Sequence, residues 1–269
     1  MSPFEAIPAD SSGFITRPIA APREPGAAFV ESWRDLALRP RIALFESALD
    51  SLWLAFQPIV SFSQPGESPF AFEALARNRE RLVVDPRDLL GLALSVGRVG
   101  DLGRVVHSRA AEALRAHREV TLFVNVDVEE LMGPLGGGED PLSEFAHRVV
   151  LEVTERAPIS ELPEIRERSA ALREEGYRFA IDDLGGGYAG LSSLALMDPQ
   201  FVKVDQVLVR NVDTEPVKRK IIASLVGLTR QLGIGCIVEG VETCGERDAL
   251  AALDCDLMQG YLFGRPGTI

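Results

Sequence analysis

The chain has 269 residues, of which 46% are hydrophobic, so it is long enough for one large globular domain or two small ones. Its formal net charge is −12 and its pI is about 4.8, which argues against nucleic acid duplexes and anionic membranes as partners of its surface. This charge still permits a small anionic ligand that metal ions hold in a pocket.

Cysteine usage indicates a reducing compartment. Cys236, Cys244 and Cys255 are odd in number and form no Cys-x-x-Cys pair, and the chain shows no signal peptide, so reduced thiols and a cytoplasmic location are expected. No apolar run approaches the roughly 18 to 20 residues of a membrane span. The three histidines lie away from every motif described below, and a zinc site built on histidine is therefore not expected.

Residues 1–28 contain five prolines and no periodic apolar pattern, which predicts a disordered or linker-like tail before a folded domain at 29–269. A lead-in helix is expected between about Phe29 and Asp50. Ser160 is a possible N-cap of a later helix, and Thr214 is expected to cap a long helix that Gly233 closes. The other predicted helices are Pro86–Ser95, Asp101–His117, one after Gly138, one after Gly190, and Gly245–Leu253.

Eight apolar runs alternate with these helices and predict the strands Leu52–Val60, Pro69–Arg77, Val120–Val126, Arg148–Thr154, Tyr177–Asp182, Phe201–Asp205, Gly235–Glu239 and Asp256–Gln259. Only a short turn separates the first two strands, so they are expected to pair antiparallel. The alternation favours an α/β fold, a modified (β/α)8 TIM-like barrel with an antiparallel first strand pair. An open Rossmann-like sheet is the alternative, but no Gly-x-Gly-x-x-Gly opens a helix here.

Polar side chains interrupt or end nearly every predicted strand, close to its C-terminal end, where a barrel places its chemistry. They are Glu73, Arg77, Asn125, Glu152, Asp182, Asp183, Lys203, Glu239 and Gln259. Taken singly, a residue such as Glu152 or Lys203 is better explained as a misjudged strand edge or as half of a buried salt bridge than as part of a site. So many polar residues on one rim favour a site.

The stretch Phe179–Tyr188 runs from an apolar strand into Asp182-Asp183 and then into three glycines. An Asp-Asp-x-Gly sequence alone is more often a turn. The acidic residues of the rim, however, outnumber its lysine and arginine, and such a cluster cannot stay ionised without cations. Carboxylate and amide ligands indicate magnesium or manganese, and adjacent aspartates suit two ions about 4 Å apart that serve phosphodiester hydrolysis. The residues thus predict a metal-dependent enzyme acting on a phosphate ester.

These motifs resemble the EAL domain family, bacterial phosphodiesterases of the second messenger cyclic di-GMP. The matching segments run in order from about residue 40 to residue 266 and are Gln57-Pro58-Ile59-Val60, Glu73-Ala74-Leu75 with Arg77, Asn125, Leu151-Glu152-Val153-Thr154-Glu155, Asp182-Asp183, Lys203-Val204-Asp205, Glu239-Gly240-Val241-Glu242-Thr243, Gln259-Gly260-Tyr261 and Phe263-Gly264-Arg265-Pro266.

The resemblance implies roles for these residues. The ligands of two divalent ions, Mg²⁺ or Mn²⁺, would be Glu73, Asn125, Glu152, Asp182, Asp183 and Glu239, with Gln259 in contact with a metal or behind a ligand. The ions would polarise a phosphate and activate water. Lys203 would hold that water or stabilise charge on the phosphate, and Glu239 is also the general-base candidate. Calcium is expected to inhibit.

The resemblance also implies substrate contacts and a product, linear 5′-pGpG. Arg77 would contact a phosphate and Gln57 a guanine edge; the other implied substrate contacts are Leu75, Asp205, Gln259 and Pro266. Glu155 would fix the glycine loop after Asp183, which couples dimerisation to activity in this family. A homodimer through the barrel helices near this loop is expected.

The sequence departs from the family pattern at the glycine loop. Leu184, Gly186 and Ala189-Gly190 stand where the family usually reads Asp-Asp-Phe-Gly-Thr-Gly-Tyr-Ser-Ser. Asn78 replaces a common Trp, and Asp127 a frequent Ser. No metal ligand is lost. A receptor or protein-interaction module without useful turnover is the alternative function, and an unrelated barrel enzyme that acts on a small acid through a carboxylate-bound metal is a third.

Overall fold

The structure is a computed structural model, and it describes residues 38–269 apart from 65, 67, 84, 134, 139, 155–163 and 186–189. The predicted tail at 1–28 and the first part of the lead-in helix therefore lie outside the described residues, as do Glu155, Ser160 and Gly186. Within the described part, no helix is both long and apolar enough to cross a membrane.

The eight strands close into a barrel in sequence order. They are β1 (Trp53–Ser61), β2 (Ala71–Arg77), β3 (Leu122–Asn125), β4 (Val149–Thr154), β5 (Arg178–Leu184), β6 (Phe201–Val204), β7 (Gly235–Val238) and β8 (Leu257–Gln259). β1 runs antiparallel to both β2 and β8, and the other neighbouring pairs are parallel. This confirms the predicted barrel with an antiparallel first strand pair.

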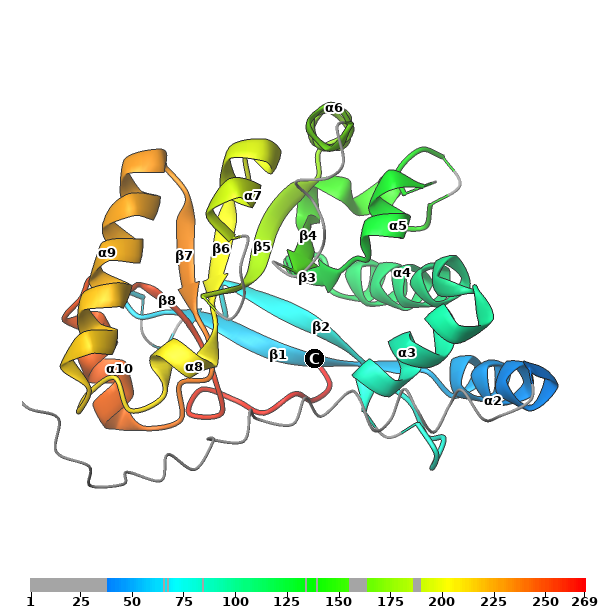
Figure 1. Ribbon diagram of the computed structural model, residues 1–269, viewed down its shortest axis with the longest axis horizontal. Helices are drawn as coiled ribbons and strands as arrows, with labels where there is room; N and C mark the ends of the chain where they lie inside the picture. Colours follow the sequence, from blue (N-terminus) through cyan, green and yellow to red (C-terminus); the bar gives the residue numbers. More distant parts are fainter. Residues whose placement is uncertain are drawn as a thin grey trace, which may run out of the picture.

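Helices surround the barrel (Figure 1). They are α2 (Leu38–Asp50), α3 (Pro86–Val96), α4 (Val99–Ala116), α5 (Val128–Met132), the 3-10 helix η1 (Ser143–Arg148), α6 (Ile165–Glu174), α7 (Gly190–Met197), α8 (Gln206–Val209), α9 (Pro216–Leu232) and α10 (Cys244–Ala251). The connection from β3 to β4 contains two short helices, α5 and η1, in place of one long helix. α5 and α8 were not expected from the sequence because a helix of one turn shows no apolar period.

Two helix caps differ from the sequence-based expectation. Thr214 does not cap α9, because the helix begins at Pro216 with Glu215 before it, and no side chain caps its end. Proline at the first helical position needs no partner for a backbone N–H, so the hydroxyl cap is dispensable. Gly233 does close α9 in the left-handed conformation, as predicted. α6 begins at Ile165 with Glu164 before it, later than expected.

The barrel interior is built in layers. A buried apolar layer is made of Ile59, Ala71, Phe123, Val150, Ala180 and Ile237, with the partly buried Phe201 and Leu257 packed against it. Each of the eight strands contributes one of these residues. Because side chains two residues apart lie on the same face of a strand, the next inward residue on each strand stands directly above this layer. That second layer contains the polar residues predicted from the sequence.

Candidate metal centre at the barrel mouth

Each polar residue of the second layer stands two positions from an apolar residue of the layer beneath it. The eight residues are Gln57, Glu73, Asn125, Glu152, Asp182, Lys203, Glu239 and Gln259. In β1 the step runs backward along the chain, from Ile59 to Gln57, because this strand is antiparallel to its neighbours. The period of two therefore brings residues from all eight strands to one end of the barrel.

Lys203 lies at the centre of this layer. Its Nζ is 2.6 Å from Glu239 Oε1, 2.7 Å from Glu152 Oε1, 3.3 Å from Glu73 Oε2 and 3.4 Å from Asp182 Oδ1. The Lys203 and Glu152 side chains are 1% and 0% exposed, so the ammonium group and the carboxylate are both removed from water. A buried charge requires a partner of opposite sign, and here one ammonium group serves four carboxylates.

Asp182 and Asp183 reach the same mouth through an irregularity in β5. Adjacent residues of a regular strand point to opposite faces of the sheet. Asp183, however, has φ 59°, and the register between β5 and β6 shifts between Ile181 and Leu184. This left-handed backbone at a non-glycine residue breaks the alternation, and such strain is often found at functional sites. Asp182, Asp183 and Glu239 thus each offer a carboxylate oxygen, and these oxygens lie within 4.8 Å of one another.

Amide side chains orient Glu73. Asn125 Nδ2 donates to Glu73 Oε1 at 3.2 Å and to Glu152 Oε2 at 3.1 Å. Gln259 Nε2 donates to Glu73 Oε2 at 2.6 Å and to Gln57 Oε1 at 3.2 Å. In this arrangement Gln259 acts as a hydrogen-bond donor behind Glu73, and Gln57 lies one step further out.

Burial and crowding shift the pKa values of these groups. Burial raises the pKa of Glu239 to about 8; the charges of Asp182 and Glu73 add to this shift, and Lys203 opposes it. Burial likewise raises the pKa of Glu152 well above its usual range. For Glu73 burial acts in the same direction, but Lys203 and the amide hydrogen bonds outweigh it, and its pKa is lowered. Burial opposes the charge of Lys203, yet the surrounding carboxylates raise its pKa well above the ordinary value.

The donor set fits a hard divalent cation. Asp182 Oδ1 and Glu152 Oε1 are buried, and each forms an ion pair with the same Lys203 ammonium group, which also serves Glu73 and Glu239. Burial raises the pKa values of Glu152 and Glu239, and a divalent cation would counter this by stabilising their charged forms. The available ligands are carboxylate and amide oxygens, which suit magnesium and manganese.

A cavity of about 480 Å³ opens over these carboxylates. Its walls include Gln57, Glu73, Leu75, Asp182, Asp183, Glu239 and Gln259, all predicted from the sequence. They also include Arg87, Gln206, Glu242 and Tyr261, which were not predicted. Gln206 begins α8, Arg87 lies in the first turn of α3, and Tyr261 follows β8 by two residues. These positions were the signal available in the sequence, because residues just after a strand or at the start of the next helix lie at the mouth of a barrel.

Three predicted substrate contacts do not line this cavity. Arg77 ends β2, and its guanidinium donates to the carbonyl of Ala76 at 2.8 Å. Asp205 caps α8, where its carboxylate accepts from Val207 N at 2.6 Å. Pro266 is half-buried in the C-terminal segment, beside Gly267, which pairs with Phe56 of β1. In this structure Asp205 has a local structural role that the sequence comparison did not indicate.

The fold and this site define a barrel protein with a cluster of carboxylate and amide side chains at its mouth. Residues 41–266 match the family model of the EAL domain. The chain belongs to the EAL domain family.

Two curated relatives illustrate the similarity. The chain is 39% identical over 118 residues to cyclic di-GMP phosphodiesterase RocR of Pseudomonas aeruginosa, a match that covers 44% of this chain and 30% of RocR. It is 28% identical over 229 residues to oxygen sensor protein DosP of Escherichia coli, covering 81% of this chain and 28% of DosP. The matched regions therefore cover less than a third of the length of either relative.

Solved structures share the fold. The Klebsiella pneumoniae BlrP1 complex with calcium and cy-diGMP superposes with a TM-score of 0.70 at 30% identity, over 81% of this chain and 56% of BlrP1. BlrP1 is also known as a manganese and cy-diGMP complex. The PaMucR phosphodiesterase in complex with c-di-GMP gives a TM-score of 0.74 at 25% identity, over 85% of this chain and 97% of that structure.

Proposed function

We propose that this chain hydrolyses cyclic di-GMP to linear 5′-pGpG with the help of divalent metal ions. The observation that carries the proposal is the group formed by Asp182, Asp183 and Glu239, whose carboxylate oxygens lie within 4.8 Å of one another beside the cavity. The names of RocR and PaMucR, a cyclic di-GMP phosphodiesterase and a phosphodiesterase bound to c-di-GMP, support the reaction and the substrate.

The proposed metal ligands are Glu73, Asn125, Glu152, Asp182, Asp183 and Glu239, and they would hold two ions, Mg²⁺ or Mn²⁺. When bound, such ions act as Lewis acids on the phosphodiester and lower the pKa of water. Glu73, Asn125 and Glu152 form one hydrogen-bonded group on β2, β3 and β4, and Asp182 and Asp183 stand on β5. Gln259 on β8 holds Glu73 in place from the side opposite to Asn125.

Lys203 and Glu239 are the proposed proton-handling and charge-stabilising pair. Glu239 Oε1 lies 2.6 Å from the Lys203 ammonium group and lines the cavity, so its carboxylate is placed to accept a proton from an attacking water. Lys203 supplies positive charge beneath the site where negative charge grows on the phosphate. The surrounding carboxylates outweigh burial and raise the pKa of Lys203 well above its ordinary value, so it stays protonated throughout.

Substrate contacts follow from the cavity walls. Gln57 and Leu75 are proposed to contact a guanine, and Gln259 lies beside them. Arg77, Asp205 and Pro266 remain proposed contacts from the family resemblance. Arg87 joins them here because it extends from the first turn of α3 into the cavity and provides a cation for phosphate.

The alternative is an EAL domain that binds cyclic di-GMP or a protein partner without turnover. The intact carboxylate set favours the enzyme; the altered segment after Asp183 favours the receptor. Incubation of the purified chain with cyclic di-GMP and magnesium, followed by chromatography of the nucleotides, separates the two. The enzyme produces pGpG in amounts that exceed the protein many times over, and a receptor retains the cyclic dinucleotide unchanged.

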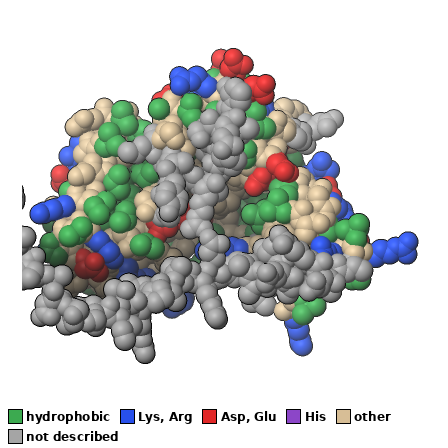
Figure 2. All heavy atoms as spheres, viewed as in Figure 1, with side chains coloured by type: hydrophobic (Ala, Val, Ile, Leu, Met, Phe, Trp, Pro, Cys, Tyr) green, Lys and Arg blue, Asp and Glu red, His purple; other side chains and the backbone are tan. Residues whose placement is uncertain are grey.

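We further propose that residues 29–269 form the catalytic domain behind a linker-like segment, and that two copies associate through helices near the glycine loop. Hydrophobic side chains gather over α7 and α9 on the face shown in Figure 2. A cavity between α6, α7 and α9 is lined by Leu194, Leu196, Leu228, Leu232 and Ile234, and apolar surface of this kind suits a protein interface. Light scattering on the purified chain tests the dimer.

The three cysteines are unpaired, which supports the proposed cytoplasmic location.

A further inference from the structure

A second cavity, of about 500 Å³, lies on the outside of the barrel between α4, α5 and the residues Leu135, Asp140 and Pro141. It shares no lining residue with the cavity at the barrel mouth. Its volume is typical of small-molecule sites. The short helices of the β3–β4 connection leave this side of α4 open, because neither α5 nor η1 is long enough to cover it.

Two glycines of α4 shape the cavity. A Cβ atom at Gly103 would lie 1.2 Å from Glu130 Oε1, so the glutamate carboxylate rests directly on the helix backbone at this point. A Cβ atom at Gly100, in contrast, would meet nothing within 4 Å. Glycine is a poor helix former, and here its missing side chains leave room for Glu130 at one position and for open space at the other.

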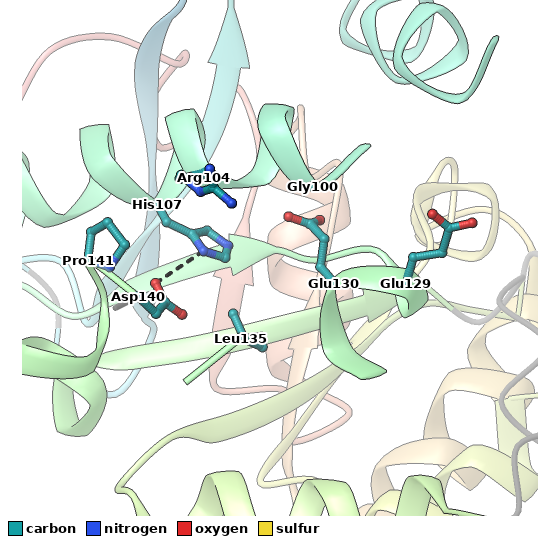
Figure 3. Close-up of a pocket in the computed structure, with 8 residues that line it drawn as sticks. All are labelled: Gly100, Arg104, His107, Glu129, Glu130, Leu135, Asp140 and Pro141. Carbon is teal, nitrogen blue, oxygen red and sulfur yellow. Dashed lines mark ion pairs between the residues drawn. The ribbon is translucent and has the colours of Figure 1, made fainter. Parts of the chain in front are cut away.

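His107 provides an unpaired polar atom at the inner end of the cavity. The residue is 5% exposed, and its Nδ1 lies 3.3 Å from Asp140 Oδ1. Figure 3 shows its imidazole and the Glu130 carboxylate on the same side of α4, with Asp140 and Leu135 facing the helix. His107 Nε2 is buried and has no hydrogen-bond partner among the described residues. A buried nitrogen without a partner is rare in folded proteins, so this atom indicates a position where a ligand binds.

Asp140 fixes the chemical character of His107. Its carboxylate also accepts from Gly136 N at 2.9 Å and from Leu142 N at 3.0 Å, so it is held in place and retains its charge. Nδ1 faces this carboxylate, and in the imidazole tautomer that carries its proton on Nδ1 the other nitrogen, Nε2, is a hydrogen-bond acceptor. The cavity therefore offers acceptors, the Nε2 lone pair and the carboxylates of Glu129 and Glu130, to whatever enters it.

The charges of the cavity walls indicate which class of ligand can bind. Glu129, Glu130 and Asp140 carry negative charge, and Arg104 is the one cationic side chain among the described lining residues. The net negative charge of the walls would repel an anion. A metal ion would need ligand atoms that converge, and within the described residues no group here brings three of them within 4.8 Å of one another. We propose that this cavity binds a small organic cation with a primary ammonium group, which donates to His107 Nε2 and Glu130.

Titration of the full chain with putrescine, without dinucleotide, tests the proposal by calorimetry and by the ¹⁵N resonance of His107 Nε2. Wild-type protein should bind saturably with a shift of that resonance. Glu130→Gln should weaken binding at least about tenfold, because it removes the charge and keeps the size. Gly100→Leu should also weaken it at least about tenfold, because the new side chain enters open space and fills the cavity.

Gly227→Leu in α9 is the matched control, because a Cβ atom there also meets nothing within 4 Å and the position lies outside the cavity. It should bind putrescine as the wild type does. The proposal is overturned if wild-type protein shows no saturable binding, or if Gly100→Leu binds equally well. It is also overturned if Zn²⁺ alone or inorganic phosphate shifts the His107 resonance and putrescine does not. Hydrolysis of cyclic di-GMP is a separate readout that Gly100→Leu leaves intact.

Discussion

The ammonium nitrogen of Lys203 lies 2.7 Å from Glu152 Oε1, and the two side chains are 1% and 0% exposed. This pair sits beneath three further acidic side chains that contact the same lysine or line the same mouth: Glu73, Asp182 and Glu239. The lysine neutralises only part of their charge. The remaining charge is what the proposed divalent cations would balance.

Lys203→Met should therefore destabilise the metal-free chain by about 3–5 kcal/mol near neutral pH, because it leaves uncompensated buried carboxylates. Without the ammonium group, the folded-state pKa values of Glu152 and Glu239, which are already raised, rise further. A carboxyl whose folded-state pKa is raised does not destabilise the fold at low pH, where it is protonated, and destabilises it increasingly as pH rises. The loss of stability in the variant should therefore be smaller at pH 5 than at pH 8. Urea unfolding at both pH values measures this. A deficit below about 1 kcal/mol at pH 8 would refute the assignment.

Glu73→Ala should abolish hydrolysis and leave the fold intact. Glu73 is held by Asn125 and Gln259 at the rim, so its removal takes away a proposed metal ligand and leaves the apolar layer below undisturbed. The loss of turnover should exceed about 100-fold, because mutation of a residue that only hydrogen-bonds to a metal ligand costs at most about 100-fold. Gln259→Ala is the matched control and should lose about 10- to 100-fold. Circular dichroism checks the fold; unchanged turnover in Glu73→Ala would remove it from the ligand set.

Arg87→Gln should raise the KM for cyclic di-GMP about tenfold with little change in kcat. Arg87 is exposed at the cavity wall and makes no ion pair within the described residues, so its charge is available to a phosphate. A hydrogen bond to a charged group contributes about 1.5–3 kcal/mol. Steady-state kinetics of Arg87→Gln beside Arg77→Gln distinguishes the two arginines. An unchanged KM in Arg87→Gln, with a raised KM in Arg77→Gln, would assign the phosphate to Arg77 alone.

Calcium should occupy the site, permit substrate binding and suppress turnover. It accepts looser geometry than magnesium and activates water poorly, so hydrolysis should fall at least about tenfold when calcium replaces magnesium. The BlrP1 complex that contains both calcium and cy-diGMP shows that calcium and this dinucleotide coexist in a related protein. Product formation is followed at equal concentrations of the two metals. Equal rates in both would contradict this expectation.

Asp140→Asn should destabilise the chain by about 1–3 kcal/mol at pH 7 and have little effect near pH 3. Burial acts to raise the pKa of Asp140, but the bond to His107 and the amides of Gly136 and Leu142 outweigh it, and the pKa is lowered. A carboxyl with a lowered folded-state pKa stabilises the protein above its unfolded pKa, and this contribution is lost as pH falls through the folded-state value. Thermal unfolding across this range provides the test. A difference that stays constant with pH would disprove the charged bond.

The sequence predicted the barrel, the antiparallel first pair and the residues of the rim because these follow from patterns within short segments: the alternation of side chains along each strand and the length of the connection to the next strand. It did not predict that Lys203 would contact four carboxylates, since this depends on the closure of the barrel over all eight strands. The same holds for Asp183, whose left-handed backbone turns it toward Asp182. An alternating strand would separate the two.

Other features depend on local alternatives, such as which residue begins a helix, that the pattern of hydrophobic residues does not reveal. Pro216 begins α9 and makes the hydroxyl of Thr214 unnecessary as a cap. The β3–β4 connection contains α5 and η1, and the open side of α4 that results could not be read from glycine-rich sequence alone. The Asp140–His107 contact joins residues from α4 and a loop, and no spacing rule predicts such a pair.

The most direct measurement is anomalous scattering from crystals of the chain soaked in manganese. Two manganese peaks within reach of Asp182, Asp183 and Glu239 are predicted, and they should vanish when Asp182→Asn and Asp183→Asn are combined. A barrel mouth without manganese density in wild-type crystals, with Lys203 still in contact with all four carboxylates, would contradict the metal centre.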